Sequence, residues 1–525
     1  MSKLLYEGAE WDFDKIQIVY DEIEKIAREE LKLDWYENQI EVISSEQMLD
    51  AYTSVGMPIM YNHWSFGKSF VQQHGQYKRG QMGLAYEIVI NSDPCISYLM
   101  EENTMTMQTL VIAHAAFGHN HFFKNNYLFK EWTNADSIIP YLSFAKKYIS
   151  DCEERYGEIE VEKILNSCHA LQRHGICKYK RPSQLSVHEE KALQESRQSF
   201  LDSQVNHLWA DLRKSEDTIT TKTDKFPEED EENILWFMEK HSPNLEPWQR
   251  EIVRIVRKVA QYFHPQPQTK LMNEGCATYV HYYIMNRLWE KEMISDGNMK
   301  EFLISHTGVV FQPKFDDVVI YNDPKTGEEK AYSRYNGINP YALGFDMFKD
   351  IERICKNPTD EDKYYFPDIA GADWIETFHN AIENFRDESF IRQFLSPELV
   401  RKWGMFVMED NADDTQYLIT AIQDEAGFTE VRDSLAERHT VSNYTPDIKI
   451  TDVDVKGDRT LFLTHQCHNG VEIGKDNIED MIKHLYRLWG HNINIQSFNS
   501  EDDTLIEEFR IDFSDEEDDD DDSPF

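Results

Sequence analysis

The segment Val111-Ile-Ala-His114-Ala-Ala-Phe-Gly-His119-Asn-His121-Phe-Phe is apolar in every direction of a helical projection except for its three histidines and one asparagine. A helix that is apolar all round is buried in a core, so this segment predicts a central helix of a mainly α-helical domain. Burying an imidazole costs free energy unless a partner satisfies it. Three histidines within eight residues therefore indicate a shared partner, for which a metal ion is the simplest choice.

The spacing of these histidines decides which of them could share one ion. His114 and His119 are five residues apart, which separates them by about 140° around a regular helix. Gly118 directly precedes His119 and favours a π-bulge or a local break that turns His119 back towards His114. His121 lies about 10 Å along the axis from His114, too far for a common ion. The alternative is a core helix whose histidines bond to neighbouring polar groups.

A second apolar segment, Leu271-Met-Asn273-Glu274-Gly-Cys-Ala-Thr-Tyr-Val-His281, carries a carboxylate. Glu274, Thr278 and His281 stand at positions i, i+4 and i+7 and share one face of a helix. We expect His281, about two turns beyond Glu274, to orient a ligand or to act as an acid or base. The alternative for Glu274 is a capping role or an ion pair with an arginine such as Arg254 or Arg257.

The composition indicates a large globular protein with an acidic excess. The 525 residues are 40% hydrophobic and 13% aromatic, enough for two or more domains. The formal net charge of −42 disfavours nucleic acid and anionic membranes as partners, because phosphate binding depends on clustered Lys and Arg. Seven scattered cysteines without a CxxC spacing are typical of reduced thiols. Neither a signal-peptide pattern nor an apolar run of about 18 residues occurs, so we expect a cytoplasmic protein without a membrane span.

Periodicity predicts a mostly helical domain at residues 1–411 and a small C-terminal domain at residues 412–500. Helical spacing covers residues 14–33, 105–120, 136–156, 161–173, 189–212, 247–263, 270–289 and 375–385, with a polar linker or insertion at residues 213–232. The C-terminal pattern is strand 417–422, helix 429–439, strands 447–456 and 459–466, helix 477–488 and strand 492–498. This βαββαβ order predicts a ferredoxin-like α+β domain. Residues 501–525 hold fourteen acidic residues against one arginine and predict a disordered acidic tail.

The two histidine-bearing segments resemble the zinc-binding helices of gluzincin metallopeptidases. Asn273-Glu274-Gly-Cys-Ala fits the pattern N-E-G-x-A of that family, and Val-Ile-Ala-His114 is similar to the entry into its HExxH helix. The resemblance implies a zincin-like core in which His114, His119 and Glu274 hold a divalent metal, with zinc expected, and leave one position open for water. Ala115, however, stands where that family has its general-base glutamate, and the second histidine comes five residues later rather than four.

A longer resemblance is to the stage V sporulation protein R (SpoVR) family. It rests on short motifs in the same order along most of the chain: Asn62-His63-Trp-Ser-Phe-Gly-Lys68, His114-Ala-Ala-Phe-Gly-His119-Asn120, Phe123-Lys-Asn-Asn126, Asp151-Cys-Glu-Glu-Arg-Tyr-Gly157, Cys168-His169-Ala170, Tyr179-Lys-Arg-Pro182, Phe237-Met-Glu-Lys240, Leu245-Glu-Pro-Trp-Gln-Arg-Glu251, Asn273-Glu274-Gly275, His306-Thr307 and Phe366-Pro-Asp-Ile-Ala-Gly371. The resemblance implies a role in spore cortex formation or in stress or developmental regulation, with a protein partner in a serine protein kinase pathway. It implies no particular reaction.

Other candidates for the site are Asn273, His63 and His169. His63 fits a ligand or substrate contact and a structural histidine equally well. Cys168 and His169 are adjacent on a helix and point about 100° apart, so they do not form a nucleophile and base pair.

Metal-assisted hydrolysis of an amide bond, in a peptide or a peptidoglycan precursor, is the first functional interpretation. The alternative is a catalytically inactive zincin-like scaffold that binds a protein partner. The alanine at position 115 favours this alternative.

Overall fold

The computed structural model describes residues 4–54, 57, 60–78, 87–179, 225–227, 229–322, 328–409, 418–441, 445–468 and 473–511. The chain forms two compact units, and each is built from two separate segments. Unit 1 comprises residues 1–162 and 262–444, and unit 2 comprises residues 163–261 and 445–525. These units differ from the contiguous domains expected at residues 1–411 and 412–500, because helical periodicity is a local signal and does not report which distant segments pack together.

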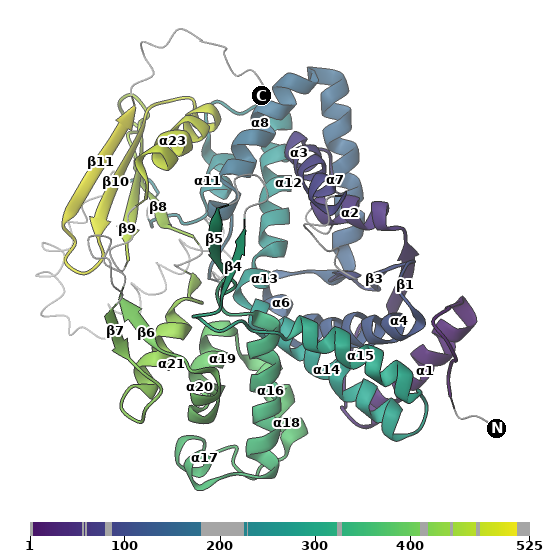
Figure 1. The fold of residues 1–525 in the computed structure, drawn as a ribbon. Helices are drawn as coiled ribbons and strands as arrows, with labels where there is room; N and C mark the ends of the chain where they lie inside the picture. Colours follow the sequence, from purple (N-terminus) through teal and green to yellow (C-terminus); the bar gives the residue numbers. More distant parts are fainter. Residues whose placement is uncertain are drawn as a thin grey trace, which may run out of the picture. The chain divides into compact units, whose positions relative to one another are not determined.

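Unit 1 is mainly helical, as the sequence predicted (Figure 1). Its helices are α1 (Phe13–Glu29), α2 (Ser45–Thr53), α3 (Trp64–Lys78), α4 (Met105–Ile112), the π-helix η1 (Ala113–His119), α5 (Asn120–Asn125), α6 (Tyr127–Trp132), α7 (Ala135–Tyr156), α13 (Pro265–Gln268), α14 (Lys270–Glu290), α15 (Asp296–Val309), α16 (Pro340–Lys356), α17 (Asp360–Tyr365), α18 (Trp374–Asn384), α19 (Asp387–Phe394), α20 (Pro397–Trp403) and α21 (Phe428–Glu437). Buried side chains of α1, α4, η1, α5, α14, α15, α16, α18, α19, α20 and α21 contribute to one core. Met48 and Ala51 of α2 form a separate small cluster with Ile88.

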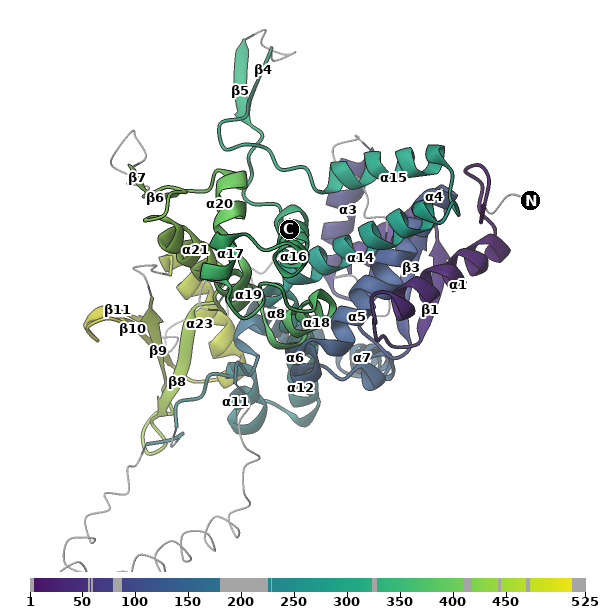
Figure 2. The same cartoon turned by 90° about the horizontal axis from the view of Figure 1, so that it is seen from below.

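The strands of unit 1 are short. A three-stranded sheet has the order β1-β3-β2, in which β1 (Asn38–Ile43) runs parallel to β3 (Cys95–Met100) and β2 (Glu87–Ile90) runs antiparallel to it. The hairpin of β4 (Val318–Asn322) and β5 (Glu329–Ser333) stands away from the helices of this unit in Figure 2. A second antiparallel pair joins β6 (Val407–Glu409) to β7 (Leu418–Ala421).

Helix α14 packs against neighbouring backbones on two sides. A Cβ atom added to Gly275 would come within 2.4 Å of the carbonyl carbon of Gly344 in α16. A Cβ atom added to Gly118 of η1 would come within 2.6 Å of the Cα atom of Ala277. The carboxylate of Asp387 accepts the N–H groups of Leu271 and Met272, each at 2.9 Å, and so satisfies donors in the first turn of α14. Close packing and this cap together fix the helix that carries Glu274.

The segment between α4 and α5 confirms the predicted irregularity at Gly118. Residues 113–119 form a π-helix, in which each turn takes up an additional residue. Every residue of η1 is buried. The continuous run from α4 through η1 to α5 is therefore the central helix that the apolar pattern predicted, with its middle widened.

Unit 2 contains α8 (Glu158–Ala170, which begins in unit 1), η2 (Gln172–His174), α11 (Ile234–His241), α12 (Pro247–Phe263, which ends in unit 1) and α23 (Lys475–Trp489). Its sheet has the order β11-β10-β9-β8, built from β8 (Asp447–Val453), β9 (Leu461–Cys467), β10 (Ile493–Asn499) and β11 (Leu505–Ile511). The pairing of β9 with β10 is parallel, and the two outer pairings are antiparallel. Together with α23 this confirms a small α+β element at the C-terminus.

The ferredoxin-like βαββαβ order is not how these elements assemble. The strand and helix predicted at residues 417–422 and 429–439 form as β7 and α21, but they belong to unit 1, where β7 pairs with β6. In their place the sheet gains β11, which occupies part of the segment predicted as a disordered tail. Local patterning located the elements but not their partners, because strand pairing is non-local.

Two further expectations fall largely outside the described residues. The helix predicted at residues 189–212 and most of the polar insertion at residues 213–232 lie there. The end of that insertion is described, and Glu231 forms an antiparallel bridge with Ile450 of β8 within unit 2. Among the described helices, none combines the length and apolarity needed to cross a membrane.

Candidate metal centre

Four side chains from three segments of unit 1 converge on one point. His119 Nε2 lies 3.5 Å from Glu274 Oε2, and His114 Nε2 lies 3.9 Å from the same oxygen. Glu87 Oε1, at the start of β2, lies 3.7 Å from His114 Nε2. The ligand atoms of Glu87, His114 and His119 all fall within 4.8 Å of one another. Ligand atoms held about 2 Å from one tetrahedral zinc ion are roughly 3.3 Å apart, so a small inward adjustment would suit a shared ion.

The π-helix explains why His114 and His119 face the same point. In a regular helix their side chains would diverge, but the additional residue in the turn returns His119 to the face of His114. Their ring centroids are 4.6 Å apart. Gly118 makes this arrangement possible on the other side, because only a residue without Cβ allows η1 to approach Ala277 so closely.

Both histidines hold their second ring nitrogen in a hydrogen bond. His119 Nδ1 lies 2.9 Å from Asn273 Oδ1. His114 Nδ1 lies 2.9 Å from His281 Nδ1, and His281 Nε2 lies 3.0 Å from His306 Nδ1 in α15. An amide oxygen only accepts, so His119 must donate from Nδ1 and keep the lone pair of Nε2 free for the centre.

The same logic orders the chain His114–His281–His306. If His114 offers its Nε2 lone pair to a metal, its proton sits on Nδ1 and is donated to His281. His281 then carries its own proton on Nε2 and donates it to His306. One assignment of tautomers therefore satisfies both hydrogen bonds that link His114, His281 and His306.

Burial keeps these imidazoles neutral. Burial and the neighbouring rings of His119 and His281 lower the pKa of His114 well below its usual value. Burial and His306 do the same to the pKa of His281, and burial with the nearby Lys349 lowers the pKa of His306 to about 4. Neutral imidazoles have a lone pair available, which metal coordination requires.

The carboxylates are the unsatisfied part of the centre. Burial and the proximity of Glu274 raise the pKa of Glu87 to about 8. Glu274 Oε2 is buried and has no hydrogen-bond partner among the described residues. Leaving a buried carboxylate oxygen without a partner is costly, so a cation at this point would repay it. The donor set of two imidazoles and carboxylate oxygens is one that zinc accepts, and the residues fit the ion.

Among the described residues, no arginine forms an ion pair with Glu274. Arg254 Nε lies 3.2 Å from Glu239 Oε1, and Arg257 Nη2 lies 2.9 Å from Glu239 Oε2, within unit 2. These arginines neutralise Glu239.

The remaining candidates take separate roles. His121 Nδ1 lies 2.8 Å from the backbone oxygen of Asp34 and also contacts Asn125, which agrees with its exclusion from the ligand set. His63 lies 2.6 Å from Ser65 Oγ in the approach to α3. His169 belongs to unit 2 and so is not part of the same compact unit as the centre.

Glu87 was not among the site residues predicted from the sequence. Its only signal is that it is the single charged residue of the strand Glu87-Ile-Val-Ile90, whose other residues are apolar. A lone glutamate at the start of a short strand is ordinary, and only the tertiary contact between β2 and η1 brings it to the histidines.

Comparison with known proteins covers most of the chain. Residues 10–444 match the family described as "SpoVR like protein", and residues 446–500 match the "SpoVR-like C-terminal domain". The chain is 53% identical over 498 residues to "Uncharacterized protein YcgB" of Escherichia coli (strain K12), a match that covers 95% of this chain and 94% of that protein. No solved structure shows significant similarity to the chain.

Proposed function

The chain belongs to the SpoVR family, and we propose that it holds a divalent metal ion, zinc in the first place, between His114, His119 and Glu274. The observation that carries the proposal is the buried, unpartnered Glu274 Oε2, 3.5 Å and 3.9 Å from the two Nε2 atoms. Asn273 and His281 support it, because each fixes the ring of one histidine through Nδ1.

The reaction that suits this centre is hydrolysis of an amide bond in a peptide or a peptidoglycan precursor. When bound, zinc supplies Lewis acidity and lowers the pKa of a coordinated water. Glu87 approaches the histidines from β2, at 3.7 Å from His114 Nε2, and provides a carboxylate where Ala115 provides none. We assign to Glu87 the role of orienting the attacking water and accepting its proton, for which it must be a carboxylate, the form that a nearby cation favours.

Substrate would reach the centre from the side of the carboxylates. The side chains of Glu87 and Glu274 keep 19% and 18% of their surface exposed, whereas His114 and His119 keep 5% and 9%. The histidines are therefore more deeply buried than the carboxylates. We expect this arrangement in a centre that acts on an external molecule.

Metal analysis of the purified full-length chain tests the proposal. We expect about one equivalent of metal in the wild type and a loss of at least tenfold in affinity for Glu274→Gln and for His114→Ala. Glu376→Gln on the exposed face of α18 is the matched control, and it should bind as the wild type does. Equal metal content in Glu274→Gln and the control would refute the site. Release of amines from short peptides and peptidoglycan fragments, abolished by chelation and restored by zinc, would establish the hydrolase.

A second candidate function is a metal-stabilised, inactive scaffold for a protein partner, which the alanine at position 115 favours. Metal would then raise the free energy of unfolding without any hydrolysis. The increase would be about 2.7 kcal/mol at a free metal concentration one hundred times the dissociation constant. The family resemblance extends this to a cytoplasmic role in spore cortex formation or in a stress or developmental pathway with a serine protein kinase. If the centre matters for that role, Glu274→Gln in the cell should reproduce the phenotype of deleting the gene.

A further inference from the structure

A groove of about 620 Å³ lies between α1 and β1, apart from the metal centre. One wall is a stripe of side chains along α1, from Phe13 through Tyr20 to Arg28. The opposite wall is formed by Asn38, Ile40 and Val42 of β1. Both elements belong to unit 1 and are neighbours in Figures 1 and 2.

The strand that lines this groove has a free backbone edge. β1 is the outer strand of the sheet β1-β3-β2. Its pairing with β3 begins with the N–H of Cys95 bonded to Glu37 O at 2.8 Å and ends with the N–H of Glu101 bonded to Ile43 O at 2.9 Å. Since alternate residues of a parallel strand turn their N–H and C=O groups to opposite sides, Ile40 and Val42 present theirs away from β3.

These outward groups are available for another strand. In the part of the chain that the structure describes, no hydrogen bond reaches the backbone N–H and C=O groups of Ile40 and Val42. An unprotected edge is a template for adding an extended segment. The strand Asn38-Gln-Ile-Glu-Val-Ile43 contains neither the lysine nor the proline that usually protects such an edge. It would accommodate about six residues over roughly 20 Å.

The side chains around the edge define what kind of segment fits. Tyr20, Trp35, Ile40 and Val42 are only partly buried and give the groove an apolar floor. Phe13, at one end of the helix stripe, is 71% exposed. An extended segment with apolar residues at every second position would bury these surfaces.

The charge of the groove is negative. Its charged lining residues are Glu24, Asp34 and Glu37 against Arg28. Arg28 is neutralised by Glu24 at 2.6 Å, and Asp34 is paired with Lys124 at 2.7 Å. Glu37 has no ion pair among the described residues, so it is a free carboxylate beside the edge.

We propose that this groove binds an extended, positively charged segment of a partner protein, which adds as a strand beside β1. Apolar residues of the segment face Tyr20 and Trp35, and a lysine or arginine pairs with Glu37. The acidic run at residues 515–522 of this chain has the wrong charge for the groove and is not the occupant. None of the residues that line the groove belongs to the metal centre.

Fluorescence anisotropy with a labelled hexapeptide of alternating valine and lysine tests the proposal on the full chain. We expect micromolar binding, about tenfold weaker binding of the twin peptide with glutamate in place of lysine, and similar weakening when alternate peptide nitrogens are methylated. Ile40→Pro removes an outward N–H without removing a bond to β3, and it should weaken binding about tenfold. Glu37→Gln should weaken it severalfold, while Glu41→Gln, which does not line the groove, should not.

Three outcomes would overturn the proposal. The first is equal affinity for the lysine and glutamate peptides. The second is unchanged binding of the N-methylated peptide, a test that needs no variant and so remains valid if Ile40→Pro does not fold. The third is a dimer of the wild type that Ile40→Pro abolishes and the peptide does not displace, which would make a second copy of the chain the occupant.

Discussion

Gly118 and Ala277 bring η1 and α14 into backbone contact: a Cβ atom at position 118 would lie 2.6 Å from Ala277 Cα and 2.9 Å from its Cβ. The same two segments carry His119 and Glu274. A change in the distance between the two helices therefore changes the geometry of the candidate centre.

Gly118→Ala should therefore separate the two helices. Because the added methyl group meets backbone rather than a flexible side chain, we expect a loss of about 1–3 kcal/mol in the free energy of unfolding, measured with urea. Metal affinity should fall at the same time, since His119 moves away from Glu274. Gly308→Ala in α15 is the matched control: nothing lies within 4 Å of its added Cβ, and alanine should stabilise that helix by up to about 1 kcal/mol. Equal behaviour of the two variants would contradict this account.

Glu87 and Glu274 should have separable roles. Glu87→Gln should keep its metal and lose hydrolysis by a factor of about 100 or more, because the amide no longer accepts a proton from water. Glu274→Gln should lose both. Metal content measured beside the rate of peptide hydrolysis distinguishes them, and loss of metal in Glu87→Gln would make Glu87 a ligand instead.

His281 should act on the metal through His114. His281→Leu removes the acceptor of the His114 Nδ1 proton, so we expect metal affinity to fall about 10–100-fold. His121→Leu also removes a buried histidine, which contacts Asp34 O and Asn125 instead, and should destabilise the fold without that fall in affinity. Competition with a chromophoric chelator gives the affinities. If the two variants lost affinity alike, the effect of His281 would be one of stability alone.

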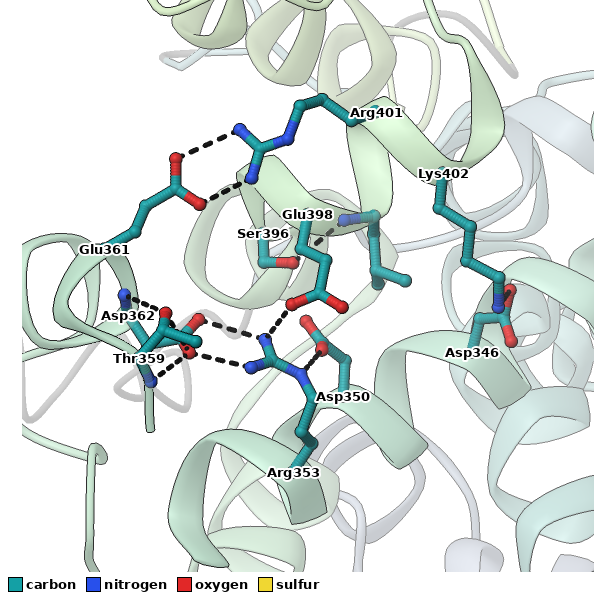
Figure 3. Close-up of polar contacts among 11 residues, drawn as sticks. Asp346, Asp350, Arg353, Thr359, Glu361, Asp362, Ser396, Glu398, Arg401 and Lys402 are labelled. Atoms are coloured by element: carbon teal, nitrogen blue, oxygen red, sulfur yellow. Dashed lines mark hydrogen bonds and ion pairs between the residues drawn. The ribbon is translucent and has the colours of Figure 1, made fainter. Parts of the chain in front are cut away.

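A buried ion-pair network between α16 and α17 should give unit 1 a measurable acid sensitivity. Arg353 Nη1 lies 2.7 Å from Asp362 Oδ2, and Thr359 also donates to that oxygen, as drawn in Figure 3. Burial opposes ionisation, but the bonds from Arg353 and Thr359 prevail and lower the pKa of Asp362 to about 2.

A carboxyl group with a lowered folded-state pKa stabilises the fold above its unfolded-state pKa and loses that contribution as the pH falls. The gap in unfolding free energy between wild type and Asp362→Asn should thus be about 2 kcal/mol at pH 6 and should close between about pH 4 and pH 2. Arg401→Gln, which breaks only the exposed pair with Glu361, should cost less than about 1 kcal/mol. A gap for Asp362→Asn that is independent of pH would exclude this explanation.

The sequence predicted the parts of the centre that depend on local chemistry. An apolar segment with histidines five residues apart and a glycine between them favoured an irregular helix over a regular core helix, and η1 is such a helix. Asn273, Glu274 and His281 were identified because they interrupt an apolar helix. Glu87 was not, since nothing near it in the chain marks it as a neighbour of His114.

In the fold as well, local features could be predicted from the sequence and contacts between distant segments could not. The bounds of α12, α14 and α23 follow from periodicity to within a few residues. The partner of β7 and the sheet that contains β11 depend on contacts between distant segments, and there the ferredoxin-like assignment was wrong. Acidic composition concealed β11, although Leu505-Ile-Glu-Glu-Phe-Arg-Ile511 carries apolar residues at both ends and in its middle.

The interrupted course of unit 2 has a consequence during synthesis. Its first segment ends at Gln261 and its second begins at Thr445, so α11 is made long before the strand that bridges to Glu231 and the helix whose Leu488 oxygen receives the Ser242 hydroxyl. At about 5–20 residues per second, a ribosome needs roughly 10–40 s to reach the missing part. The rest of unit 1 is synthesised within that interval. The first segment of unit 2 therefore remains without its second segment while unit 1 is completed. A premature stop near residue 440 would leave that first segment without the sheet of unit 2.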